Sequence, residues 1–237
     1  MDKLIDIEQN AYVEGRNIHD GIRTIDQVID YASKRGEKAA VLAIDFQKAF
    51  DSIEHDYIWK VLDAMGFGYG LISMIKTLYS NCESAVLNNG KTTKYFPLER
   101  ACRQGDPIAP YLFIIALEPL LIKLKQNVEG YKLPGGDAKQ SVLADDLSGF
   151  PKNEREVDKT FEILAEFRKV SGLDVNKEKS EILLLGDWDR MALSRHNIKI
   201  VKTLKITGAV FSKPEDRPMA EKLNFDKVVR GIEANFN

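Results

Sequence analysis

The chain has few cysteines, no excess charge of either sign and no long hydrophobic run. Only Cys82 and Cys102 are cysteines, and no CxxC or Cys/His cluster occurs, so neither a disulfide framework nor a zinc site is indicated. With 34 Lys and Arg against 36 Asp and Glu, the net charge of -2 gives no overall basic excess of the kind that marks many nucleic-acid binders. No apolar run reaches the roughly 18 residues of a membrane span, and the N-terminus lacks the apolar core of a signal peptide. We therefore expect no membrane partner and an intracellular location, in the nucleus or the cytoplasm.

What is present is the composition of a globular protein. At 237 residues, 44% hydrophobic and 30% charged, the chain can bury a sizeable core in one large or two modest domains. Apolar residues at three- and four-residue spacing predict helices over 20–36, 54–66, 71–80, 107–126 and 154–172, the first with Asp20 as its N-cap. Apolar runs predict strands over 39–46, 179–186 and 205–213 and two short strands within 141–150, and Asn89-Gly90 predicts a hairpin over 84–98. This order does not alternate like a parallel doubly wound sheet, so we expect an α+β fold with an antiparallel sheet packed on helices.

Three aspartates adjoin predicted buried strands. The segment "SVLADDLSGF" (141–150) carries Asp145 and Asp146, and Asp45 follows the run "VLAI". Burying an unpaired carboxylate costs several kcal/mol. One interpretation is that the three side chains converge and bind a divalent metal, because carboxylate and phosphate oxygens are the ligands that Mg²⁺ prefers. The other is that Asp145-Asp146 is a turn between strands and that Asp45 caps the following helix.

The surrounding motifs favour the first interpretation. Six segments occur in order: "NAYVEGRNI", "AIDFQKAFDSI", "CRQGDPIAPYLF", "LADD", "SGLDVNKEKSEIL" and "KITGAVFSK". Over residues 8–212 they resemble, in turn, the fingers, first catalytic, nucleotide and template, Ala-Asp-Asp, leaving-group lysine and primer-grip blocks of reverse transcriptases of the LINE (non-LTR retrotransposon) type. "RQGDP" with an aspartate block before it and ADD after it is very specific.

The resemblance implies a right-hand polymerase fold and its reaction. We expect partial fingers over residues 1–40, a palm reverse transcriptase core over 41–212, and the start of the thumb or a connection over 213–237. The implied activity is that of an RNA-directed DNA polymerase, which adds dNTPs to the 3′ end of a DNA primer on an RNA template. Two Mg²⁺ ions, with Mn²⁺ as an alternative, would stabilise charge as phosphorus is attacked.

By resemblance, Asp45, Asp145 and Asp146 are the catalytic metal ligands, and the backbone oxygen of Phe46 completes a metal shell. Lys179 matches the lysine that protonates or stabilises departing pyrophosphate. It lies in "NKEKSE", where a solvated lysine is the alternative.

Four more residues match nucleotide-binding positions. Phe50 matches the steric gate, whose ring clashes with a ribose 2′-hydroxyl; the alternative is a core role. Gln104 and Gly105 match the turn beside the incoming nucleotide, where glycine allows close backbone approach and the amide can bond sugar or base. Arg103 is either a phosphate contact or a surface charge.

The fingers block supplies Arg16 as a contact to triphosphate or template. None of the three histidines, His19, His55 and His196, has partner spacing, so we expect all of them at the surface.

The match also has departures. Leu143 stands where an aromatic is usual, Thr207 where a larger apolar residue is expected, and Ala109 where serine is usual. We expect the endonuclease, the remaining fingers and most of the thumb of a polyprotein to have no counterpart in the 237 residues. The alternative function is therefore a catalytically weak or silent remnant that acts at most as a nucleic-acid-binding module; a metal-dependent hydrolase is a third, less supported possibility.

Overall fold

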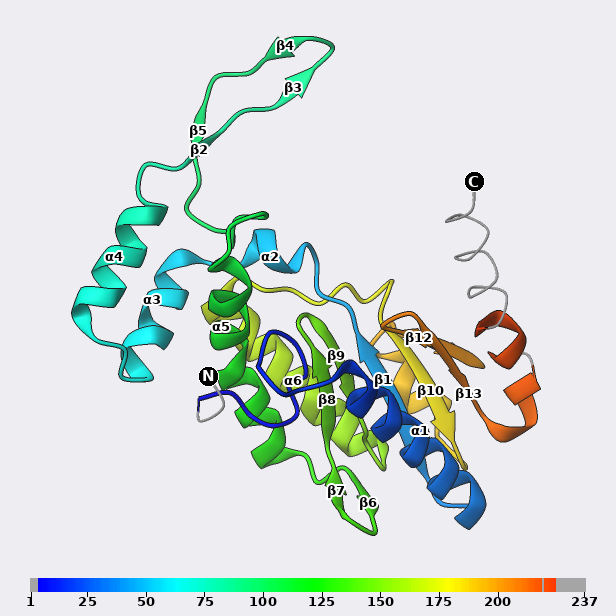
Figure 1. The fold of residues 1–237 in the computed structure, drawn as a ribbon. Helices are drawn as coiled ribbons and strands as arrows, with labels where there is room; N and C mark the ends of the chain where they lie inside the picture. The colour runs from blue at the N-terminus through cyan, green and yellow to red at the C-terminus, as the bar shows by residue number, and fades with distance from the viewer. Residues whose placement is uncertain (1–3, 219, 225–237) are drawn as a thin grey trace, which may run out of the picture.

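The structure is a computed structural model that describes residues 4–218 and 220–224 (Figure 1). Its centre is a five-stranded sheet in the order β11-β10-β1-β9-β8. The strands are β1 (Ala39–Ile44), β8 (Gln140–Leu143), β9 (Asp146–Gly149), β10 (Glu181–Leu185) and β11 (Lys199–Val201). Neighbouring strands are antiparallel except for β10 and β11, which are parallel. The predicted antiparallel sheet is confirmed apart from this edge strand.

The central strand is apolar throughout because both faces of the sheet are covered. In β1, Ala40, Leu42 and Ile44 join one buried cluster, whereas Ala39 and Val41 join another. Successive side chains of a strand point to opposite faces, so a strand buried on both sides needs a continuous apolar run. The run "AAVLAI" meets this requirement.

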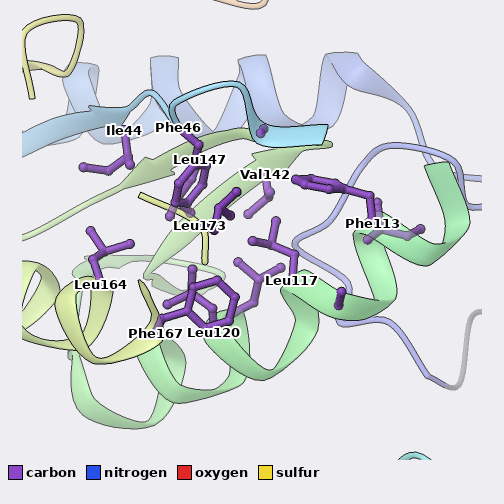
Figure 2. Packing of buried hydrophobic residues seen from close by; sticks show 14 of the residues in the cluster. Ile44, Phe46, Phe113, Leu117, Leu120, Val142, Leu147, Leu164, Phe167 and Leu173 are labelled. Carbon is purple, nitrogen blue, oxygen red and sulfur yellow. The ribbon is translucent and has the colours of Figure 1, made fainter. Parts of the chain in front are cut away.

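Helices form the layer on one face. These are α3 (His55–Ala64), α5 (Ala109–Asn127) and α6 (Glu154–Ser171). Figure 2 shows Leu117 and Leu120 of α5 beside Phe167 of α6, beneath Ile44 and Leu147 from the sheet.

The opposite face is covered by α1 (Ile18–Arg35) and by the hairpin of β12 (Thr203–Ile206) and β13 (Ala209–Ser212). The N-cap of α1 is Asn17, whose side chain accepts a bond from the His19 N–H; the prediction of Asp20 was wrong because the helix starts earlier. α1 packs on the sheet. The predicted boundary between the fingers and the palm, after residue 40, falls inside β1.

A second part of the molecule extends away from the sheet (Figure 1). It comprises α4 (Tyr69–Tyr79), β2 (Glu83–Ser84), β3 (Leu87–Asn88), β4 (Lys91–Thr92) and β5 (Phe96–Pro97), whereas α2 (Ala49–Ser52) lies next to α5. Asn89 and Gly90 have φ of 49° and 75°, as a type I′ turn requires, so the predicted hairpin is confirmed.

The sequence patterns did not predict the hairpin of β6 (Tyr131–Leu133) and β7 (Gly136–Ala138), nor the short α7 (Arg190–Ser194) and η1 (Pro214–Asp216). No described helix is both long and apolar enough to cross a membrane. Of the predicted thumb or connection over 213–237, residue 219 and residues 225–237 lie outside the described part.

The prediction that all three histidines lie at the surface is wrong for two of them. His55 lies against Trp59 and Tyr79, with Nε2 2.9 Å from the Ala101 carbonyl oxygen. His196 has a side chain that is 13% exposed, and its Nε2 lies 2.6 Å from a carboxylate oxygen of Asp158. Only His19 is exposed. The error arises because most of these partners, Tyr79 and Ala101 for His55 and Asp158 for His196, are distant in sequence.

Candidate active site

The ends of two neighbouring strands bring the three aspartates into one region. In the antiparallel pair of β1 and β9, Ile44 lies opposite Leu147, so Asp45 continues β1 alongside Asp146. β8 and β9 are joined by a two-residue turn, Ala144-Asp145, because Leu143 pairs with Asp146. The carboxylates of a hairpin tip and of the adjacent strand end therefore share one edge of the sheet.

The turn has a strained residue at its first position. Ala144 has φ of 57°, while Asp145 is not among the residues with positive φ, a pattern typical of type II′ turns. The turn and the convergence of the aspartates are thus compatible, because Asp145 does lie in a turn and this turn faces the end of β1. The other part of the second interpretation is wrong, since Lys48 and not Asp45 is the N-cap of α2.

The carboxylates repel one another. Burial raises the pKa of Asp145, and the charge of Asp45 raises it further. Burial also raises the pKa of Asp146, with added repulsion from Asp145 and then Asp45. A bound cation would offset this repulsion.

The donor set fits a metal that takes part of its ligands from elsewhere. Within the described residues, no three His, Cys, Asp or Glu side chains form a ready-made metal cluster. Mg²⁺ is usually held by one or two carboxylates together with substrate phosphates and waters, and the three aspartates suit that mode of binding.

Two lysines face the same space. Asp45 and Asp146 line a cavity of about 90 Å³ together with Lys179 and Lys205. Lys179 was expected near the site, whereas Lys205 was missed. The alternation in "TLKI" of buried Leu204 and Ile206 with the exposed lysine indicates only that Lys205 points away from the core, and does not place it beside the aspartates.

A second missed residue fixes the backbone of Asp45. Ser180 is fully buried, and its Oγ accepts a bond of 3.1 Å from the Asp45 N–H while donating to the Asn176 carbonyl oxygen at 2.8 Å. Asn176 in turn donates its N–H to the Asp45 carbonyl oxygen at 2.7 Å. The segment before β10 thereby holds the end of β1.

The predicted nucleotide residues lie beside α2. The Cys102 N–H donates to the Phe50 carbonyl oxygen at 2.6 Å, which brings the turn with Gln104 and Gly105 alongside the chain that follows Asp45. Gln104 and Gly105 are exposed, and Gly105 has φ of +82° with no atom within 4 Å of an added Cβ. The half-buried Phe50 ring stacks on Phe113 at 4.3 Å between centroids, so one face serves the core.

The two predicted arginines already have protein partners. Arg103 forms an ion pair with Asp106 at 3.1 Å and lies over the Tyr79 ring at 4.6 Å. Arg16 donates to the carbonyl oxygens of Ile5, Asp6 and Gln9, so the structure does not bring its guanidinium to the aspartates.

The remaining positions named in the sequence analysis lie in the core or in a pocket next to Asp146. The Phe46 side chain is 6% exposed and belongs to the core, where Ala109 is also buried. Leu143 and Thr207 line one small pocket together with Asp146. The apolar floor next to the aspartates is thus shared by the β8–β9 turn and the β12–β13 turn.

Comparison with known proteins identifies the family. The family model described as "Reverse transcriptase (RNA-dependent DNA polymerase)" matches residues 1–214. The chain is 30% identical over 186 residues to the Transposon TX1 uncharacterized 149 kDa protein of Xenopus laevis, covering 78% of this chain and 14% of that protein. It is 25% identical over 174 residues to the Pol polyprotein of the type-2 retrotransposable element R2DM of Drosophila melanogaster, covering 73% of this chain and 16% of that polyprotein. The chain therefore spans less than a fifth of the length of these two relatives.

Solved structures share the fold. The telomerase from Candida albicans, in complex with a fragment of telomeric RNA, has a TM-score of 0.58 at 11% identity, covering 86% of this chain and 33% of that chain. The apo telomerase from Candida tropicalis has a TM-score of 0.57 at 12% identity, covering 82% of this chain and 38% of that chain. The expected palm architecture is confirmed.

Reverse transcriptases use divalent metal ions and copy a nucleic-acid template. The matched motifs, the palm fold and the retrotransposon relatives agree: the chain belongs to the reverse transcriptase family, in its LINE (non-LTR retrotransposon) branch.

Proposed function

We propose that this chain is the catalytic core of an RNA-directed DNA polymerase that extends a DNA primer with dNTPs on an RNA template. The observation that carries the proposal is the position of Asp45 at the end of β1, beside the turn that bears Asp145 and Asp146. Their mutual repulsion and their half-buried or exposed side chains suit groups that bind cations together with substrate.

The aspartates would hold two Mg²⁺ ions, with Mn²⁺ able to substitute, and the Phe46 carbonyl oxygen would add a ligand. Bound ions of this kind lower the pKa of a primer 3′-hydroxyl and stabilise the charge of the triphosphate. Asp45 is kept in position by Ser180 and Asn176, so it would bind without rearrangement of the strand.

Other side chains would orient the substrate and complete proton transfer. Lys179, which lines the same cavity as Asp45 and Asp146, would donate a proton to, or pair with, the departing pyrophosphate. The free face of Phe50 would contact the sugar, and Gln104 and Gly105 would border the incoming nucleotide. Arg16 and Arg103 would reach substrate only by leaving their present partners.

A weak or silent core is the second candidate, and one observation favours it. Duplex binding depends on basic contacts along the phosphate backbone, and the net charge here is -2. We also propose that fingers, thumb and endonuclease segments of a polyprotein are partners of this core.

Primer extension on poly(rA)/oligo(dT) with Mg²⁺ tests the proposal. The chain as given, a version fused to the fingers and thumb of a relative, and the fused version with Asp145→Asn and Asp146→Asn are compared. We expect strong extension only by the fused version with intact aspartates. Extension that persists in the double variant contradicts the metal-site assignment, and no extension by any version favours the silent core.

A further inference from the structure

A loop near the N-terminus forms hydrogen bonds with the Ala144-Asp145 turn through the side chain of Gln9. Gln9 has no exposed surface, and its side-chain amide forms a reciprocal pair of hydrogen bonds with one residue of that turn. Gln9 Nε2 donates to the Ala144 carbonyl oxygen at 3.2 Å, and Gln9 Oε1 accepts from the Ala144 N–H at 2.9 Å. Both polar backbone groups of the residue before Asp145 are therefore satisfied by one side chain.

Ala144 is the residue of the turn that most needs external support. Its φ of 57° is in the left-handed region, which costs a residue with a Cβ about 1–2 kcal/mol. Such a conformation persists only where the surrounding structure enforces it. The amide of Gln9 supplies two directional bonds at this position, and the Ala11 N–H, which also donates to Oε1 at 3.0 Å, fixes the amide itself.

The loop is fastened to the sheet. Gln9 and Val142 form a parallel β-bridge, with bonds from the Asn10 N–H to the Val142 carbonyl oxygen (2.8 Å) and from the Val142 N–H to the Glu8 carbonyl oxygen (2.9 Å). Residues 8–10 thus act as a short extra strand beside β8.

The loop is also fastened to itself and to α5. The Arg16 guanidinium donates to the Gln9 carbonyl oxygen at 2.8 Å and to the Ile5 carbonyl oxygen at 2.8 Å. Asp6 pairs with Lys125 of α5 at 2.9 Å, and its N–H donates to Glu118 of the same helix at 3.0 Å. These bonds make Arg16 a support of the loop that carries Gln9.

We infer that Gln9 is a positioning residue, which holds the Ala144-Asp145 turn in its strained conformation and so sets the place of the Asp145 and Asp146 carboxylates relative to Asp45. The inference rests on the proposed metal site and adds to it a residue from outside the palm strands. Groups that orient metal ligands without touching the metal change affinity by about 10- to 100-fold when they are removed.

The test compares Gln9→Met with a matched control, Asn10→Leu. Methionine keeps the volume of glutamine and removes both bonds to the turn. Asn10 is the next residue of the same loop, and its amide bonds the Val142 carbonyl oxygen at 3.3 Å but not the turn. Mn²⁺ affinity is measured by electron paramagnetic resonance, and exchange of the Ala144 amide hydrogen by mass spectrometry, with unfolding temperature recorded for each protein.

We expect Gln9→Met to weaken Mn²⁺ binding about tenfold or more and to speed exchange at Ala144, whereas Asn10→Leu changes both much less. Equal Mn²⁺ affinity in Gln9→Met and the unaltered chain overturns the inference, as does an equal loss in both variants.

Asp145→Asn separates this failure from failure of the proposed function. If the unaltered chain and Asp145→Asn bind Mn²⁺ equally, the aspartates are not the metal site, and both the inference and the proposed function are wrong. If Mn²⁺ binding depends on Asp145 but the fused version extends no primer, the proposed function fails while the effect of Gln9→Met still decides the inference.

Discussion

At the scale of single residues, the candidate site combines exposed groups, to which the proposed function assigns substrate contacts, with buried groups that hold them in place. Phe50 belongs to both classes, since one face of its ring stacks on the fully buried Phe113 and the side chain as a whole is only half-buried. Asp45 is similar, with its backbone bonded to buried Ser180 and its carboxylate in the cavity.

Replacing Phe50 by Ala tests whether the ring face that is not stacked on Phe113 sets the choice between dNTPs and rNTPs. If the free face excludes the ribose 2′-hydroxyl, Phe50→Ala in the fused polymerase raises the use of rNTPs relative to dNTPs by about tenfold or more, the scale set by steric discrimination of small groups. Single-nucleotide incorporation with each substrate measures this ratio. An equal loss with rNTPs and dNTPs, together with a lower unfolding temperature, assigns the ring to the core alone.

Glu118 provides a pH prediction. This glutamate of α5 is 1% exposed, and burial raises its pKa to about 7 from 4.5. Because the folded pKa exceeds the unfolded one, the carboxyl imposes no penalty at low pH. The penalty grows as pH rises from about 4.5 to about 7, up to about 3 kcal/mol.

We therefore expect Glu118→Gln to remove part of the loss of unfolding free energy between pH 5 and pH 8. The glutamine Oε1 can still accept the bond from the Asp6 N–H. Urea denaturation of both proteins at the two pH values checks this. A parallel pH dependence of the two proteins refutes the assignment.

At the scale of elements, hairpin turns help to place the side chains of the candidate site. Two of the hairpin turns in the molecule share one backbone geometry. Asn89-Gly90 joins β3 and β4, and Thr207-Gly208 joins β12 and β13, each with positive φ at both residues. Asparagine tolerates this conformation, whereas a β-branched threonine at φ of 47° is strained.

Thr207→Asn should consequently stabilise the protein by about 1 kcal/mol, or raise the unfolding temperature by about 2–4 °C. Asn89→Thr is the reciprocal control, and it should lower stability by a similar amount. Thermal unfolding followed by circular dichroism measures both. A loss of stability in Thr207→Asn would mean that the threonine side chain makes contacts worth more than the strain it adds.

The elements also show which parts of the fold can be predicted from local sequence patterns. The helix over 154–172 and the strand at "AAVLAI" could be predicted because their apolar spacing is local and regular, and Asn-Gly specified its own turn. The parallel pairing of β11 with β10 could not be predicted, since β11 has only three residues, two exposed and one half-buried, and these carry no periodic signal. The bonds of Gln9 to Ala144 link positions 135 residues apart, and no local pattern announces such a contact.

At the scale of the whole molecule, both faces of the central sheet are covered, and the residues of the candidate site come from the ends of its strands and from the adjacent β12–β13 hairpin. β1 brings Asp45, the β8–β9 turn brings Asp145 and Asp146, the segment before β10 brings Lys179, and β12 brings Lys205. Aspartate placement could be predicted from the motifs, whereas Lys205, Ser180 and Gln9 emerged only when distant segments were brought together.

The central claim is that Asp45, Asp145 and Asp146 jointly bind divalent metal in the presence of substrate. Titration of Mn²⁺ by electron paramagnetic resonance, with primer-template and a non-hydrolysable dNTP bound to the fused polymerase, tests it most directly. We predict two bound ions per protein and loss of at least one in Asp45→Asn and in Asp145→Asn. Two ions bound with unchanged affinity in both variants would contradict the account.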